Sequence, residues 1–153
     1  MIRSARLAAI VLGSAALVGT AALPATATDA HTLPATHRSP IVIGAVQADS
    51  PGRDDGSNRS LNAEWVTVKN TGLRPVNLKG WTLTSRSTHK KYHFKNLRLA
   101  GHQSVRVHTG HGRDTIHDVY QDRRDYVWHN QRDTATLRND HRRIIDTKHW
   151  GRR

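Results

Sequence analysis

Apolar and polar residues alternate along most of the chain beyond residue 40. Successive side chains of a strand point to opposite faces of a sheet, so a period of two is typical of a half-buried β-strand. Val105 and Val107 form the apolar face of one such segment, and Ala135 and Leu137 form that of another. We therefore expect an all-β chain of short strands with little helix.

The same alternation selects the residues of the core. We expect nine apolar side chains to face inward, and these positions are Val66, Val68, Trp81, Leu83, Phe94, Val105, Val107, Ala135 and Leu137. The β-branched run Ile41–Val46 predicts a first strand. The segment Asp49–Ser60 contains Pro, Gly and Asn, and it predicts a loop rich in turns.

Three motifs carry the most specific information, in the order Glu64–Asn70 (EWVTVKN), Leu78–Leu83 (LKGWTL) and Val127–Leu137 (VWHNQRDTATL). Between the last two lie Tyr92–Phe94 and Leu97–Gly101. Together these segments resemble the lamin tail domain. The resemblance implies an immunoglobulin-like antiparallel β-sandwich of about seven to nine strands. We expect this domain to span residues 40–150.

The resemblance also gives some residues a local role. Gly80 precedes Trp81, and a glycine permits the tight backbone approach that turns the indole into the core. We expect Asn70 and Asn130 to hold local turns with their side chains. Arg132 stands where the family usually has glycine.

The resemblance implies a function of the binding class. In lamins the domain binds partner proteins and, weakly, nucleic acid. Exported bacterial relatives resemble surface or secreted modules. We therefore expect a non-catalytic binding module of the exported bacterial type, and no cofactor.

The first 27 residues predict a secretory signal peptide. Arg3 and Arg6 form a positive start, Leu7–Leu23 is apolar, and Ala25–Ala27 has the small-x-small pattern of a cleavage site. The apolar run is shorter than the about 20 residues of a spanning helix, so cleavage is favoured over an uncleaved anchor. Residues 28–39 predict a flexible linker. We expect a secreted mature protein without a membrane span.

The chain has no cysteine. It therefore forms no disulfide and has no thiolate nucleophile or metal ligand, so its stability must come from a packed core. The part beyond the linker has the size of one immunoglobulin-type sandwich of about 100 residues. One domain is expected.

The charge is large and unevenly distributed. The sequence has 24 Lys and Arg against 12 Asp and Glu, a net charge of +12, and +10 without the signal peptide. Between Glu64 and Asp114 there are ten basic residues and no acidic one. A field of one sign attracts polyanions, although a basic composition that serves solubility is an equal alternative. The candidate polyanion-binding residues, expected to converge on one sheet face or edge, are Lys90, Lys91, Lys95, Arg98, Arg106 and Arg113.

Catalytic and metal chemistry have little support in the sequence. No G-x-S-x-G motif or comparable nucleophile context occurs. His89 with His93, and His108 with His111, lack a sequence-adjacent acidic residue or Cys that would complete a tetrahedral metal site. The acidic cluster in Asp49–Asp55 does not follow the spacing of an EF-hand loop. We expect neither an enzyme nor a metal protein.

Two functional hypotheses follow. In the first, a secreted module binds an anionic polymer, such as a cell-wall polymer or extracellular nucleic acid, through a basic face. In the second, a structural or adhesive module recognises a protein partner through a sheet edge or an exposed aromatic residue. Trp65 is the candidate for that contact because it lies opposite Val66 and Val68 in the alternation. Only the first hypothesis predicts binding that weakens steeply with salt.

Overall fold

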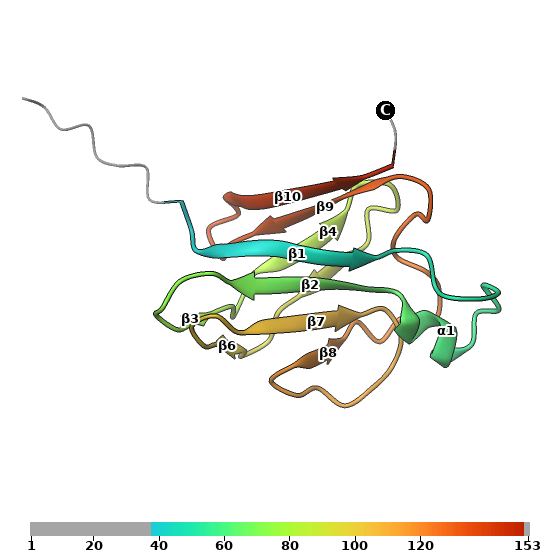
Figure 1. Cartoon of the computed structure of the whole chain (residues 1–153), viewed down its shortest axis with the longest axis horizontal. Coiled ribbons are helices and arrows are strands. Elements are labelled where there is room, and N and C mark those ends of the chain that lie inside the picture. Colours follow the sequence, from blue (N-terminus) through green and yellow to red (C-terminus); the bar gives the residue numbers. More distant parts are fainter. Residues whose placement is uncertain (1–37, 152–153) are drawn as a thin grey trace, which may run out of the picture. The chain divides into compact units, whose positions relative to one another are not determined.

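The structure is a computed structural model that describes residues 38–151. The predicted signal peptide lies outside the described residues, as does most of the predicted linker. The described chain forms ten strands and one short helix (Figure 1). They are β1 (Ile41–Gln47), α1 (Asn58–Ala63), β2 (Trp65–Asn70), β3 (Val76–Asn77), β4 (Thr82–Ser85), β5 (Lys91–His93), β6 (Arg98–Leu99), β7 (Ser104–His108), β8 (Asp118–Tyr120), β9 (Asp133–Arg138) and β10 (Ile144–Trp150).

Two four-stranded sheets make up the sandwich. One has the strand order β1-β2-β7-β8 and the other β10-β9-β4-β5, while β3 and β6 form a small sheet of their own. Figure 1 shows β1, β2, β7 and β8 one beneath the other. The expected all-β, immunoglobulin-like sandwich is confirmed. The eight strands of the two large sheets agree with the expected seven to nine, and alternation did not reveal the additional two-residue strands β3 and β6.

One strand pair departs from the antiparallel pattern. β8 pairs with β7 in parallel, with Val119 opposite Val107. The loop 109–117 carries the chain back beside the start of β7, so β8 runs in the same direction as its neighbour. Alternation within a strand contains no information on this direction, and the pairing had to come from the tertiary structure.

The core lies between the two large sheets. All nine residues expected to face inward are buried. Leu83 on β4 is opposite Leu137 on β9, and Val66 on β2 is opposite Val107 on β7. The largest fully buried side chain is Trp128, which is 2% exposed and comes from a loop. Its position outside any strand explains why alternation did not select it.

The segment expected to be a loop contains the start of α1. The Ser57 hydroxyl accepts a hydrogen bond from the backbone N–H of Ser60 (3.2 Å) and so caps the helix. Leu61 from this helix is buried. A six-residue helix is too short for a helical period to appear in the sequence. Among the described residues, no helix has the length and apolar character needed to cross a membrane.

The sequence predicted that the side chains of Asn70 and Asn130 hold local turns, and only Asn70 does so. Asn70 is buried, and its Nδ2 donates to the carbonyl oxygens of Arg74 (2.8 Å), Leu99 (3.2 Å) and Ala100 (3.1 Å). It therefore holds the turn after β2, as expected. Asn130 instead reaches a distant loop.

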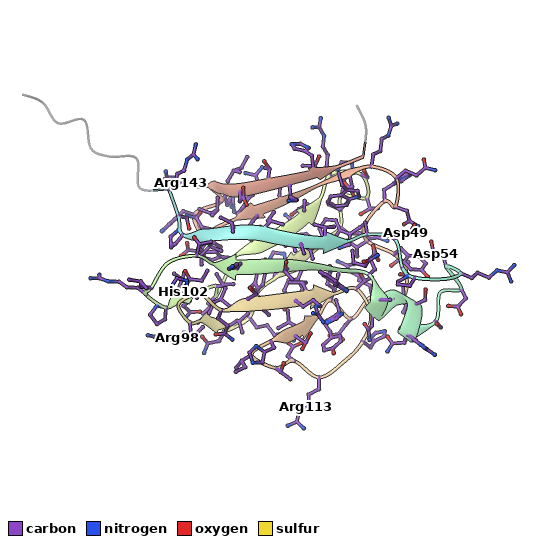
Figure 2. The ribbon with its side chains drawn as sticks, in the orientation of Figure 1. Asp49, Asp54, Arg98, His102, Arg113 and Arg143 are labelled. Carbon is purple, nitrogen blue, oxygen red and sulfur yellow. The ribbon has the colours of Figure 1, made fainter. Side chains whose placement is uncertain are left out.

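The Asn130 side chain binds the loop that follows β1. Its Nδ2 donates to Asp49 Oδ1 and to Asp54 Oδ2, both at 2.8 Å. Figure 2 shows Asp49 and Asp54 near each other at the α1 end of the sandwich. The expectation of a local turn was wrong for Asn130, because its partners lie far away in sequence.

Gly80 adopts a conformation that requires glycine. Its φ is 81°, in the left-handed region that other residues rarely adopt. Its N–H donates to the carbonyl of Phe94 (3.1 Å), and the next residue, Trp81, is buried in the core. The need for glycine therefore comes from this left-handed backbone, and not from the tight backbone approach that was expected, since a Cβ at Gly80 would meet nothing closer than 3.4 Å.

Candidate polyanion-binding surface

The outer face of the β10-β9-β4-β5 sheet carries a regular array of basic and hydroxyl side chains, which we call the β4–β9 face. Cross-strand register places its outward residues in three rows. The rows are His93–Thr82–Arg138–Ile144, Lys91–Thr84–Thr136–Thr147 and Arg86–Thr134–His149. Opposite side chains of such a row lie about 5 Å apart, so neighbouring members are close enough to contact the same group.

A basic hollow lies at the first row. It has a volume of about 510 Å³, and we call it the Arg138 hollow. Its basic lining comes from β5, β9 and the β9–β10 hairpin, and comprises Lys91, His93, Arg138 and Arg142. Arg138 Nη1 donates to the carbonyl oxygen of Arg142 (3.1 Å), which holds the two arginines together. Asp140 also lines the hollow, and its carboxylate lies 3.9 Å from Nε2 of His141.

A second basic hollow lies at the third row. It measures about 600 Å³, and we call it the Arg132 hollow. Arg86, Arg132 and His149 line it together with Thr134. The Thr134 hydroxyl is 2.7 Å from Nδ1 of His149, which fixes the imidazole beside the strand. The two hollows therefore lie at opposite ends of one sheet face.

The acidic residues of these strands lie outside the three rows, although Asp133 lines the Arg132 hollow. Within residues 38–151, none of the positions in the three rows is acidic. Asp146 on β10 accepts the backbone N–H of Ile43 through Oδ2 (2.7 Å), so it points toward β1. Asp133 on β9 is buried and accepts the hydroxyl of Ser85 (2.6 Å). The three rows thus present basic and hydroxyl side chains, with Ile144 as an exposed apolar one.

The hydrogen bonds to Asp133 control its charge. Burial acts to raise the pKa of this carboxyl, but the Ser85 hydroxyl and the N–H groups of Ser87, Thr134 and His129 together hold the pKa below its ordinary value. Asp133 is therefore ionised at neutral pH, and it organises the loop that carries Arg132 while it also lines the Arg132 hollow.

Three of the six residues chosen from the sequence are paired with aspartates. Lys90 Nζ bonds the carboxylate of Asp125, and it donates to the carbonyl of Tyr126 (2.6 Å). Lys95 Nζ lies 3.8 Å from a carboxylate oxygen of Asp114. The segment after the basic tract thus folds back on it and neutralises part of its charge.

Arg106 is the third paired residue. Its Nη1 lies 3.8 Å from Oδ1 of Asp118, and its guanidinium lies 4.8 Å from the centre of the Trp65 ring. Arg106 stands on the outer face of the β1-β2-β7-β8 sheet, whereas Lys91 stands on the β4–β9 face. These two residues cannot contribute to one flat surface.

The other predicted residues are dispersed as well. Figure 2 shows Arg98 at the β6 end of the sandwich, beside His102, and Arg113 on the loop before β8. The expected convergence of the six residues on one face was therefore wrong. Of the six, Lys91 alone lines the Arg138 hollow. Polyanion binding by these residues stays a prediction.

Sequence reasoning missed most of the basic residues on the β4–β9 face. Arg132, Arg138 and Arg142 lie outside the uninterrupted basic tract, in a segment that also contains aspartates. A signal was present, because the alternation that turns Ala135 and Leu137 inward also turns Arg138 outward. The pairing of β9 with β4 and β5 was needed to join it to Lys91.

Glu64 is the one glutamate of the chain, and it is fully buried. Both carboxylate oxygens accept the backbone N–H of Val127 (3.1 Å each), and Oε1 also accepts that of Trp128. Burial raises the pKa of Glu64 to about 7, although these N–H groups act to lower it. Glu64 therefore holds the loop that places Trp128 in the core, and it is not exposed to a ligand.

His108 on β7 belongs to the β1-β2-β7-β8 sheet, and its imidazole ring links α1 to β8. Its Nδ1 donates to the carbonyl oxygen of Asn62 (2.7 Å), since a carbonyl only accepts. Its Nε2 lies 2.8 Å from Asp118 Oδ1, so the ring bridges α1 and β8. The ring also stacks on Tyr120 at 5.0 Å between centres. Within the described part of the chain, no three His, Cys, Asp or Glu residues are arranged to hold a metal ion.

The fold and this surface define an immunoglobulin-like module with a basic sheet face. Residues 34–152 match the family model of the Lamin Tail Domain. The chain therefore belongs to the lamin tail domain family, a family of immunoglobulin-like domains not known for catalysis. No curated protein matches the sequence.

Proposed function

We propose that the chain is an exported, non-catalytic binding module that engages anionic polymers, either a cell-wall polymer or extracellular nucleic acid, through the β4–β9 face. The observation that carries the proposal is the composition of that face. Within residues 38–151, its outward rows contain five basic side chains and no acidic one, namely His93, Arg138, Lys91, Arg86 and His149. Such a surface binds phosphates by releasing their counterions.

Family membership is consistent with this proposal. A lamin tail domain is an immunoglobulin-like module of the non-catalytic class. The hollows on the β4–β9 face are lined by residues of several strands, so the sandwich brings basic residues from distant parts of the sequence together.

The salt dependence of binding tests the proposal. Double-stranded DNA and purified wall teichoic acid are titrated into the protein between about 50 and 200 mM salt. The variant Lys91→Gln/Arg138→Gln/Arg142→Gln is expected to bind more weakly and to show a smaller slope of log affinity against log salt. The slope should fall by about one for each phosphate that the variant no longer neutralises.

A matched variant removes the same charge elsewhere. Lys95→Gln/Arg98→Gln/Arg113→Gln changes three cations of the basic tract that lie off the β4–β9 face, and it is expected to keep most of the slope. The reverse result would move the site to the basic tract. If the unmodified protein binds neither polymer at low salt, the proposal is rejected.

Export has its own test. The charged start, the short apolar run and Ala25–Ala27 support cleavage after Ala27. Mass spectrometry of protein from the culture medium is expected to find Thr28 at the N-terminus. Full-length chain in the membrane fraction would contradict cleavage.

The second candidate function is recognition of a protein partner through the opposite sheet. Trp65, His108 and Tyr120 lie side by side in one row there, and Arg106 covers the Trp65 ring. Trp65 is half-buried. A partner captured by this row would remain bound at high salt and would be released by the variant Trp65→Ala.

A further inference from the structure

We propose that one end of the sandwich docks on a membrane surface that contains anionic phospholipids. This end consists of residues 38–40, 71–75, 98–103 and 139–144, and we call it the Leu73 end. In the docked state Leu73 and Ile144 enter the headgroup layer, and the arginines beside them contact lipid phosphates. Ile144 ends the first row of the β4–β9 face, but the partner is a different one, so the inference goes beyond the proposed function.

Exposed apolar side chains gather in this region. Three large ones are exposed in the described chain, and they are Leu73 (83%), Ile116 (61%) and Ile144 (56%). Leu73 lies in the β2–β3 turn, and Ile144 begins β10. Ile116 lies beside the β6–β7 turn, because Nε2 of Gln103 donates to its carbonyl oxygen (2.9 Å). Apolar residues scattered singly need no explanation, whereas a group of them in one region indicates an interaction site.

The turn that carries Leu73 is held against its neighbours. The N–H and the hydroxyl of Thr71 both donate to the carbonyl oxygen of Pro40, each at 2.8 Å. On the other side, a Cβ at Gly101 would lie 2.2 Å from the carbonyl oxygen of Leu73, so the two turns pack as closely as glycine permits. The Leu73 side chain is therefore presented to solvent by a backbone that is bound on two sides.

A hollow suited to a phospholipid headgroup lies next to this turn. It has a volume of about 420 Å³, and Arg38, Arg143, Ile144 and Ile145 line it together with polar residues. Both of the charged residues in its lining are arginines. A guanidinium binds phosphate oxygens in a bidentate manner, and an aliphatic side chain contacts the glycerol and acyl groups that follow the phosphate.

The two ends of the sandwich differ in charge. Figure 2 shows Arg98, His102 and Arg143 at the Leu73 end, and Asp49 and Asp54 at the opposite end. The four segments of the Leu73 end contain five arginines and one aspartate, a net charge of +4. The loop 48–57 at the opposite end contains three aspartates and one arginine, a net charge of −2. A negative surface therefore attracts the domain with its Leu73 end forward.

An anionic bilayer matches both features of this end. Each arginine near such a surface strengthens binding about fivefold, and an apolar side chain that leaves water for the headgroup layer strengthens it further. A soluble polyanion would use the arginines and leave Leu73 in water. The pairing of exposed apolar side chains with arginines is the observation that favours lipid.

Vesicle sedimentation tests the docking. Residues 28–153, which contain every described residue, are mixed with vesicles of phosphatidylcholine or of equal parts phosphatidylcholine and phosphatidylglycerol. We expect binding to the mixed vesicles to be at least about tenfold tighter. Equal binding to both, or none to the mixed vesicles, would overturn the proposal. Release by excess soluble glycerol 3-phosphate would also overturn it, because it would show a phosphate site that needs no membrane.

Matched variants locate the contact. Arg38→Gln/Arg143→Gln is expected to weaken binding to the mixed vesicles by about tenfold or more. Arg53→Gln/Arg59→Gln removes the same charge from exposed positions at the opposite end, and it is expected to change binding by less than about twofold. Equal effects of the two variants would show a general effect of charge and overturn the proposal.

Leu73 is tested without any change of charge. Leu73→Ser is expected to weaken binding to the mixed vesicles by about fivefold, whereas Leu73→Trp is expected to keep it, since tryptophan is favoured at the membrane interface. Circular dichroism checks that each variant is folded. Unchanged binding by folded Leu73→Ser would overturn the insertion of this side chain.

Site-specific fluorescence reports the orientation directly. The chain has no cysteine, so Leu73→Cys and Arg59→Cys each accept one environment-sensitive fluorophore. Mixed vesicles are expected to shift the emission of the label at position 73 to shorter wavelength and to leave that at position 59 unchanged. No shift at position 73, or equal shifts at both positions, would overturn the docked orientation.

The outcomes separate this inference from the proposed function. Leu73→Ser is expected to bind double-stranded DNA as the unmodified protein does, because Leu73 lies off the β4–β9 face. A parallel loss of DNA and vesicle binding would overturn a separate membrane site. DNA binding without vesicle binding would reject the membrane site alone, and vesicle binding without binding of DNA or teichoic acid would reject the proposed function alone.

Discussion

Glu64 makes the stability of this domain depend on pH in a way that can be isolated by one substitution. The carboxyl is 0% exposed at the junction of α1 and β2, and it accepts the N–H groups of Val127 and Trp128. Burial raises its pKa from an ordinary 4.5 to about 7. Replacement by Gln keeps the shape and an acceptor oxygen but removes the titration.

The magnitude follows from the two pKa values. Between pH 4.5 and 7 the folded state holds a proton that the unfolded state has released, so the free energy of unfolding falls as the pH rises through this window. Each unit of pKa corresponds to about 1.4 kcal/mol. Glu64 therefore lowers the stability by about 3 kcal/mol between pH 4.5 and pH 8, and the loss levels off above about 7.

Urea unfolding of the wild type and of Glu64→Gln at half-unit steps of pH is the assay. All other titratable groups are common to both proteins, so the difference between the two curves isolates Glu64. We expect this difference to shift by about 3 kcal/mol in favour of the variant from pH 4.5 to 8. At low pH the variant is expected to be less stable by about 1 kcal/mol, because the NH2 group of Gln is a donor and cannot accept the hydrogen bond from the Val127 N–H.

An exposed carboxyl provides the control. Hydrogen bonds from Ser57 hold the pKa of Asp55 below its ordinary value, so Asp55→Asn is expected to show a flat difference over the same window. A flat difference for Glu64→Gln as well would refute the reasoning, because it would mean that Glu64 does not bind a proton on folding in this range.

Three further predictions concern the core and its buried polar groups. Trp81→Ala is expected to reduce the free energy of unfolding by about 3–5 kcal/mol, and a loss below about 1 kcal/mol in urea would contradict its place in the core. Asn70→Ala leaves three carbonyl groups without their donor and is expected to cost about 2–3 kcal/mol, whereas Asn77→Ala on the exposed β3 is expected to change little. Asp133→Asn is expected to cost about 2 kcal/mol at pH 7. Because the folded pKa of Asp133 is lowered, its stabilisation is present above the unfolded value of 3.8 and is lost as the pH falls, so the cost of the variant must shrink between pH 4 and pH 2.

Local alternation determined the strands and the core of this protein. Successive side chains of a strand point to opposite faces, so the apolar ones pack in the core and the polar ones face solvent. The residue types alone therefore show which positions are buried. Val66, Val68, Val105 and Val107 are buried for this reason. The resemblance of the motifs to a known family predicted the sandwich, whereas the left-handed backbone that requires glycine at position 80 became visible only in the structure.

The tertiary structure decided the functional surface. The sequence shows ten basic residues without an intervening acid, but pairing in space brings Asp114, Asp118 and Asp125 onto that tract. Coulomb interactions act across a few ångströms whatever the separation along the chain. Strand pairing therefore sets the charge of a surface, as it does where it brings Lys91 and Arg138 onto the β4–β9 face. The order of charged residues along the sequence does not reveal which strands pair.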